Sequence, residues 1–459
     1  MWSAVVEACR AVLAASAPVP PIAAVAVTSQ YMSVVPVRRD GTPTGPCIMW
    51  MDKRGAANNL ALLNDHSFGL FLDRHGLIPL PSGSDNIAHI SVLRDHHPAA
   101  YAAADAFVEP MDYVNARLTG RVCATQSTAF STLCCDNRTW GAVVYDPALV
   151  AATGLDPAKL APLVPMNGFV GEITSAAAAE LGIAAGIPVT VATIDSITSA
   201  IGTGALGPTE GAIVIGTTSV LVSHIDDKRG DLMGGLLAVP SPLSGMYYVM
   251  AENGVGGRAL EWFLRSIVYA DDAFATPAPA DLYDRAMAAA AGVAAGGDGA
   301  QFLPWLLGSI APHPNDDVRG AFVGLDLAHT RAHLARAVLE GVALNLAWLL
   351  PYVEAFVGNE FPILRFGGGG AMSPLWAQIL ADATGRAVDR LDEPRATNAR
   401  GAAFLAFAEL GVLDIHDTPA LLRVASHHEP EPAQRDVMDA ALRRLAALHP
   451  TLALHHPRA

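Results

Sequence analysis

Two periodicities of apolar residues alternate along the chain. Short apolar runs end in small or polar residues, as buried strands do, and longer stretches repeat their apolar residues at helical spacing. Leu334, Val338, Val342 and Leu346 follow this second pattern and predict a core helix after Thr330. The chain is therefore expected to alternate strands with helices.

The alternation extends through both halves of the sequence. It predicts strands over 22–28, 34–37, 47–50, 188–194, 211–215 and 361–366, and helices over 2–15, 87–120, 375–384 and 399–409. Such alternation favours two α/β domains that face a cleft. We place the first domain at 1–204, the second at 205–415 and a helical tail at 416–459.

Two predicted strands end in turns that suit a phosphate. Four glycines at 367–370 precede Ser373 and Pro374 at a helix start, where a ligand can lie on bare backbone and face the helix N–H groups. The second turn, 216–219, is small and rich in hydroxyl groups. A nucleotide held between the two turns is one interpretation, and a flexible glycine connector is the other.

Two aspartates stand at the ends of predicted strands. Asp195 follows the strand 188–194 and could accept the proton of a substrate hydroxyl, although an acidic helix cap would have the same pattern. Asp52 lies beside Lys53 and Arg54, so a salt-bridged turn is its alternative interpretation. With the two phosphate-type turns, these carboxylates form a coherent set for phosphoryl transfer.

Composition removes several classes of protein. A net charge of −15 over 459 residues argues against a nucleic-acid binder, and five cysteines, an odd number, fit the reducing cytoplasm. The apolar stretch 337–357 contains Glu340 and Glu354, which favours a buried helix over a membrane span. The sequence has no P-loop motif, and its G-x-G-x-x-G at 202–207 runs directly into Pro208.

The order of these segments resembles that of the FGGY carbohydrate kinases, most nearly their xylulokinase-like branch. The matching segments are 27–30, 50–54, 112–113, 117–120, 188–204, 216–219, 312–324, 367–385 and 400–403. The resemblance implies the two-domain sugar-kinase, actin and Hsp70 type of α/β fold, which is ribonuclease H-like, with ATP and Mg²⁺ bound in the cleft between the domains. It also implies a small sugar or polyol as the substrate and, by analogy, a homodimer.

The same resemblance assigns roles to individual residues. Asp195 would be the general base on the substrate hydroxyl. The other assignments are Gln30, Tyr31, Met32 and Asp52 near the polyol, Gly216, Thr217 and Thr218 at the β- and γ-phosphates, and Gly368, Gly369 and Ser373 beside the adenosine. The metal ligands stay unassigned.

The chain departs from the family pattern at three places. Gln30-Tyr31-Met32-Ser33 replaces the Gln-Met-His-Gly typical of xylulokinases, which puts xylulose itself in doubt, and Asp195-Ser196 replaces an Asp-Asn pair. The Asp-x-Gly-Thr hairpin with which the family pattern begins has no counterpart before Ile22, so we expect an N-terminally truncated first domain. Either the start is misassigned and the enzyme is an ATP-dependent kinase of a small ketose or polyol, or the chain is a pseudokinase that binds sugar or nucleotide.

Overall fold

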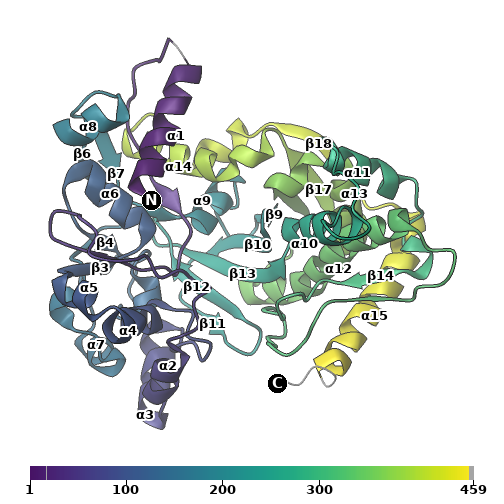
Figure 1. The fold of residues 1–459 in the computed structure, drawn as a ribbon, viewed down its shortest axis with the longest axis horizontal. Helices are drawn as coiled ribbons and strands as arrows, with labels where there is room; N and C mark the ends of the chain where they lie inside the picture. Colours follow the sequence, from purple (N-terminus) through teal and green to yellow (C-terminus); the bar gives the residue numbers. More distant parts are fainter. Residues whose placement is uncertain (17, 454–459) are drawn as a thin grey trace.

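The computed structural model describes residues 1–16 and 18–453 and shows two halves side by side (Figure 1). The first half of the chain, purple to blue, lies on the left of the view, and the second half, green to yellow, lies on the right. Both halves combine strands with helices, so the predicted two-domain α/β class is confirmed.

The first half is built from short strand pairs between helices. Its strands are β1 (Thr28–Ser29), β2 (Val35–Val37), β3 (Ala106–Val108), β4 (Ala124–Thr125), β5 (Leu163–Val164), β6 (Phe169–Glu172), β7 (Pro188–Thr190) and β8 (Thr193–Ile194). Its helices are α1 (Trp2–Ala15), α2 (Ala56–Leu62), α3 (Asp65–Leu70), α4 (Asn86–His96), α5 (Pro98–Ala103), α6 (Pro110–Thr119), α7 (Pro147–Thr153), α8 (Ser175–Leu181) and α9 (Asp195–Gly202). The pairs that matter for the site are β1 with β8 and β2 with β3.

A mixed eight-stranded sheet organises the second half, in the order β11-β12-β13-β10-β9-β16-β17-β18. The strands of this half are β9 (Gly211–Ile215), β10 (Thr218–Ile225), β11 (Gly230–Asp231), β12 (Leu236–Pro240), β13 (Tyr247–Val255), β14 (Gln301–Leu303), β15 (Ala321–Val323), β16 (Ile363–Gly367), β17 (Ala387–Leu391) and β18 (Val424–His428). Its helices are α10 (Gly257–Phe263), α11 (Leu282–Ala291), α12 (Arg331–Val357), α13 (Pro374–Thr384), α14 (Thr397–Glu409) and α15 (Arg435–Ala453). The strands β9, β16 and β17 run parallel, which places their carboxyl ends along one edge.

The two faces of this sheet have different partners. One face packs on α12 and α13 in a large apolar core that includes Ile213 and Ile215. The other face presents Val214 and Val222 to apolar residues of α9 and of the first half. The second core therefore joins the two halves of the molecule.

Helix α12 is the core helix that the apolar spacing predicts. Thr330 caps its first turn, and the helix is long and apolar enough to cross a membrane. However, 83 % of its most apolar 18-residue stretch is buried inside the protein, as in the core helix of a folded domain. The apolar character of 337–357 is thus explained by packing on the sheet.

Four predicted elements differ from the structure. Over 22–28 only β1 and an isolated bridge at Val25 form, because the partner segment 188–194 is itself broken into β7 and β8. The predicted strand 47–50 is a single bridge at Ile48, and β3 interrupts the helices of 87–120. These segments are too short or too irregular for a continuous ladder.

The predicted helical tail also contains β18, which adds a strand to the sheet beside β17, before α15 begins. Residues 454–459 of this tail lie outside the described residues.

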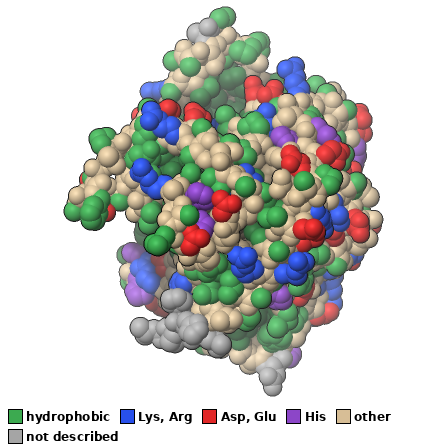
Figure 2. Space-filling model, turned by 90° about the vertical axis from the view of Figure 1, so that its right-hand side faces the viewer, with side chains coloured by type: hydrophobic (Ala, Val, Ile, Leu, Met, Phe, Trp, Pro, Cys, Tyr) green, Lys and Arg blue, Asp and Glu red, His purple; other side chains and the backbone are tan. Residues whose placement is uncertain are grey.

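Acidic, basic and histidine side chains are mixed on the face of the molecule in Figure 2, and no basic patch stands out on that face.

Helices α9 and α14 cross with their backbones in contact. A Cβ on Gly202 would lie 2.0 Å from the carbonyl oxygen of Thr397, and one on Gly401 would lie 1.9 Å from that of Thr198. Only glycine fits at both positions. This crossing fixes the start of α9 relative to the second half of the protein.

Candidate active site

Asp195 is the first residue of α9, directly after β8. Its backbone carbonyl accepts hydrogen bonds from the hydroxyls of Thr198 and Ser199, both at 2.9 Å, and from Asn398 Nδ2 at 3.1 Å. The carboxylate does not cap the helix. Among the described residues, no side chain donates a hydrogen bond to it. The helix-cap interpretation is therefore not what the structure shows.

The electrostatic surroundings of Asp195 suit a proton acceptor. Burial raises the pKa of its carboxyl to about 6, and the backbone N–H groups of Ser196 and of Asp195 itself oppose this rise. A group with a pKa near 6 is mostly ionised at neutral pH and still basic enough to take a proton as a hydroxyl reacts.

The two predicted phosphate turns lie next to each other. Strand β16 pairs with β9 so that Gly367 stands opposite Val214. A Cβ on Gly368 would lie 2.6 Å from the carbonyl oxygen of Ile215, and one on Gly370 would lie 2.8 Å from the Ile215 Cβ. The glycine run therefore packs directly on the end of β9, where the turn 216–218 begins.

The turn 216–218 is open to solvent but held from behind. Gly216 and Thr217 are exposed, and Thr218 is half-buried at the start of β10. Gly256 N donates to Thr217 O at 3.0 Å, and Gly257 N donates to Gly216 O at 2.9 Å. A rigid turn with exposed hydroxyl and backbone groups can receive an anionic ligand.

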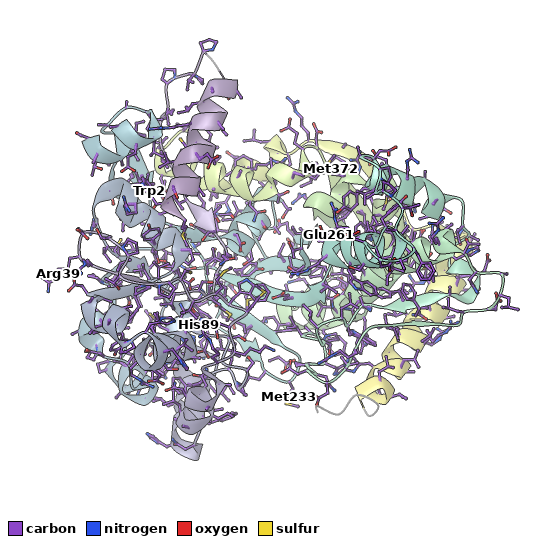
Figure 3. The ribbon with its side chains drawn as sticks, viewed as in Figure 1. Trp2, Arg39, His89, Met233, Glu261 and Met372 are labelled. Atoms are coloured by element: carbon purple, nitrogen blue, oxygen red, sulfur yellow. The ribbon has the colours of Figure 1, made fainter. Side chains whose placement is uncertain are left out.

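Ser373, which is predicted to lie beside the adenosine, is the N-terminal cap of α13. Its Oγ accepts a hydrogen bond from Trp376 N at 3.1 Å and so caps α13. The hydroxyl also contacts Met287 Sδ at 3.1 Å. Gly368 is half-buried and Gly369 is exposed in front of this helix, where Figure 3 labels Met372.

One of the predicted acceptor residues, Gln30, meets the segment before Asp52 at a single hydroxyl group. Ser33 Oγ accepts hydrogen bonds from Gln30 Nε2 at 3.2 Å and from Trp50 N at 3.3 Å. The structure thus brings the loop 30–33 to the segment that leads to Asp52. Met32 has a left-handed backbone with a φ of 60°, which is uncommon for a residue other than glycine.

Tyr31 packs against the apolar core that joins the two halves. Its hydroxyl is buried and has no hydrogen-bond partner among the described residues, and burial together with nearby Glu109 and Asp85 raises the pKa of the phenol. A buried hydroxyl without a partner is costly, so a substrate hydroxyl could satisfy it.

Asp52 is engaged by its neighbour. The Arg54 Nε lies 3.0 Å from both carboxylate oxygens, and Arg54 lowers the pKa of Asp52. The Asp52 carbonyl contacts His89 Nε2 at 3.1 Å; His89 is labelled in Figure 3. The salt-bridged turn is therefore formed, and a role of Asp52 at the polyol stays a prediction.

Sequence reasoning missed two residues of β13 that face Asp195. Glu252 stands opposite Val220 of β10, two register steps from the turn 216–218. Burial, and then the charge of Asp195, raise the pKa of Glu252 to about 7. The Asp195 charge reaches Tyr248 as well, whose buried hydroxyl has no partner of normal geometry among the described residues.

A period of two could have revealed these residues. Tyr248, Met250 and Glu252 alternate along β13 and so share one sheet face. Glu252, a charged residue in an otherwise buried series, could have been singled out from this alternation. Its proximity to Asp195, however, depends on the packing of α9 over the same sheet face, which no local sequence pattern shows.

The chain matches two family models over most of its length. Residues 1–202 match the N-terminal domain, and residues 211–410 match the C-terminal domain, of the FGGY family of carbohydrate kinases. The chain belongs to this family. The recognised resemblance is thereby confirmed, together with the fold that it implied.

Several relatives of this family member are kinases of different small molecules. It is 26 % identical over 419 residues to a xylulose kinase of Staphylococcus epidermidis, with 90 % of this chain and 80 % of that kinase covered. It is 30 % identical over 437 residues to a glycerol kinase of Thermus brockianus, with 92 % and 83 % covered.

A solved structure supports the same placement. The crystal structure of a xylulose kinase from Rhodospirillum rubrum superposes with a TM-score of 0.80 at 27 % sequence identity, covering 98 % of this chain and 89 % of that one. The FGGY fold therefore extends through both halves of the described structure.

Proposed function

We propose that this family member transfers the γ-phosphoryl group of ATP to a hydroxyl of a small ketose or polyol. The observation that carries the proposal is the Asp195 carboxylate, which is largely buried, faces Glu252 and accepts no hydrogen bond from a side chain in the described residues. The names of the relatives, xylulose kinase and glycerol kinase, support acceptors of this size.

The residues present fit a triphosphate. The glycines at 368 and 370 leave a cradle that a Cβ would fill, and the adjoining turn exposes Gly216 and Thr217. We infer that Thr217 and Thr218 face the β- and γ-phosphates and that Gly368, Gly369 and Ser373 border the adenosine. When bound, Mg²⁺ neutralises phosphate charge. Glu252 is a carboxylate of the kind that could hold it.

In this arrangement the protein's residues perform the proton transfer and the alignment. Asp195 would accept the proton of the reacting hydroxyl through its free carboxylate. Gln30, Tyr31, Met32 and Asp52 would bind the remaining hydroxyls, and α9 holds Asp195 in place through the Asn398 hydrogen bond to its carbonyl. Positioning of this kind supplies much of the rate of a phosphoryl transfer.

Replacement of the base tests the proposal. Asp195→Asn keeps the size of the side chain but removes the proton acceptor, so ADP release with a responsive acceptor should fall by at least ~100-fold. Nucleotide affinity, measured by calorimetry, should stay within about twofold. Asp112→Asn is the matched control, since Asp112 is another buried acid of the first half, on α6 and outside the site.

The acceptor panel should contain xylulose, gluconate, glycerol and other small polyols. Near-normal turnover of Asp195→Asn would refute the assignment of the base. Binding of nucleotide and polyol by the wild type without any ADP release would favour the pseudokinase, an alternative that neither the fold nor the relatives described above support. The homodimer, the cytoplasmic location and the domain boundaries stay predictions.

A further inference from the structure

Glu109 is a buried carboxylate that the family resemblance leaves without a role. It directly precedes α6 and is only 2 % exposed. Burial raises its pKa to about 8, while hydrogen bonds from neighbouring groups act in the opposite direction. No ion pair to Glu109 forms among the described residues. A buried acid without a cation needs another reason to be there.

In the described structure, the Glu109 carboxylate is surrounded by hydrogen-bond donors. Oε1 accepts from Met32 N at 3.1 Å, from Asn86 Nδ2 at 2.7 Å and from Ser131 Oγ at 2.9 Å. Oε2 accepts from Ser33 N at 2.9 Å. A carboxyl group can accept hydrogen bonds at both oxygens whether it is ionised or, as its raised pKa implies at neutral pH, protonated, so it is the side-chain group that suits this set of donors.

Two of these donors belong to the backbone of the predicted acceptor loop. Without Glu109, the N–H groups of half-buried Met32 and buried Ser33 would lose these hydrogen-bond acceptors. Met32 also holds a left-handed backbone with a φ of 60°, which is unfavourable for a residue with a Cβ. The hydrogen bonds to Glu109 stabilise this otherwise unfavourable conformation of the loop.

The effect of Glu109 extends from Ser33 to the rest of the loop. Ser33 Oγ accepts from both Gln30 Nε2 and Trp50 N. Fixing the Ser33 backbone therefore fixes the point at which two segments of the acceptor site meet. Asn86 of α4 and Ser131, on the other side of the carboxylate, anchor Glu109 itself.

We propose that Glu109 is a positioning residue that holds the acceptor loop 30–33 in its binding conformation through the backbone N–H groups of Met32 and Ser33. The residue does not touch substrate. Its effect on acceptor binding rests on the proposed function, whereas its stabilisation of the loop conformation can be measured without any substrate.

The primary test is Glu109→Gln, which keeps the side-chain length. An amide has one acceptor oxygen, so its NH₂ group must face either Ser33 N or the donors around Oε1. In hydrogen–deuterium exchange, peptides that cover 28–34 should exchange at least ~10-fold faster than in the wild type. The KM for the acceptor should rise about 10- to 100-fold, and the KM for ATP should stay within about twofold.

Asp112→Asn is the matched control, because Asp112 lies on the adjoining helix, is equally buried and has a pKa that burial raises to about 8. One of its carboxylate oxygens has no partner in the described structure, and no hydrogen bond joins Asp112 to the loop 30–33 among the described residues; its charge acts on the pKa of Glu109 but not on the donors of the loop. Exchange in 28–34 and the acceptor KM should both remain at wild-type values in this variant.

Each outcome decides one of the two proposals. Unchanged exchange over 28–34 in a folded Glu109→Gln would overturn the role of Glu109. If Glu109→Gln does not fold, Glu109→Asp decides instead: the shortened carboxylate should speed exchange over 28–34, and wild-type protection would refute the proposal. A wild type that neither binds nor phosphorylates any acceptor would refute the proposed function, while the exchange data would still report on the loop.

Discussion

The crossing of α9 and α14 gives a stability prediction with a clear sign. In Gly401→Ala the new Cβ would start 1.9 Å from the Thr198 carbonyl oxygen and 2.7 Å from its carbon. Ordinary van der Waals contact begins near 3.4 Å, so the helices would have to separate by roughly 1.5 Å. The opposing atoms are backbone and cannot rotate away.

The magnitude follows from two opposing terms. Overpacking of a tight contact costs about 1–3 kcal/mol, whereas alanine in place of glycine within a helix gains about 1 kcal/mol. Since the overlap here involves backbone, we expect the cost to dominate. A net loss of up to about 2 kcal/mol would lower the thermal midpoint of a chain of this size by a few degrees.

Catalytic activity should fall together with stability, because Thr198 lies one turn after Asp195 and donates a hydrogen bond to the Asp195 carbonyl. Differential scanning calorimetry and kcat of Gly401→Ala measure the two effects. Gly69→Ala in α3 is the control, as nothing lies within 4 Å of its new Cβ. A thermal midpoint for Gly401→Ala at or above that of the wild type would show that the helices do not touch as described.

Three further predictions concern titration and capping. The folded pKa of Asp195, about 6, exceeds its unfolded value of 3.8, so ionisation of this group lowers the stability of the protein as the pH rises from about 4 through 6. Asp195→Asn should therefore melt at a higher temperature than the wild type at pH 8, by an equivalent of up to roughly 3 kcal/mol. This difference should shrink toward pH 4. The charge of Asp195 contributes to the raised pKa of Glu252, so the pKa of Glu252 should fall in Asp195→Asn, as a carboxyl NMR titration can measure; an unchanged pKa of Glu252 would contradict their coupling. Ser373→Ala should lower stability by about 1 kcal/mol through loss of the α13 cap, as chemical denaturation can measure, and a KM for ATP that rises more than about threefold would show that the hydroxyl also reaches the nucleotide.

The sequence predicts the two adjoining glycine-containing strand ends well because each strand end is a local feature. Gly216 and Gly367 each follow a short apolar strand, and parallel strands in one sheet bring such ends together. The core helix after Thr330 and the helix start at Ser373 are equally local, since spacing and capping residues determine them.

The residues that were missed depend on distant pairing. Glu252 reaches Asp195 only through the register of β13 with β10 and the packing of α9 over that face. Glu109 was covered by a predicted helix, although β3 and a turn separate α5 from α6. Its function becomes visible only when Met32, some 77 positions away, donates to it. Periodicity within one segment carries no information about such partners.

The strand β18 has a practical consequence for anyone who wishes to express the second half alone. It covers the outer edge of β17, with Arg390 Nε bonded to Ser426 Oγ at 2.8 Å, yet it lies beyond residue 410, where the family match ends. A fragment cut at that boundary would leave the backbone groups of β17 unpaired next to apolar Val388 and Leu391. Such an edge invites intermolecular sheet growth, so fragments should extend at least through His428 to remain monodisperse.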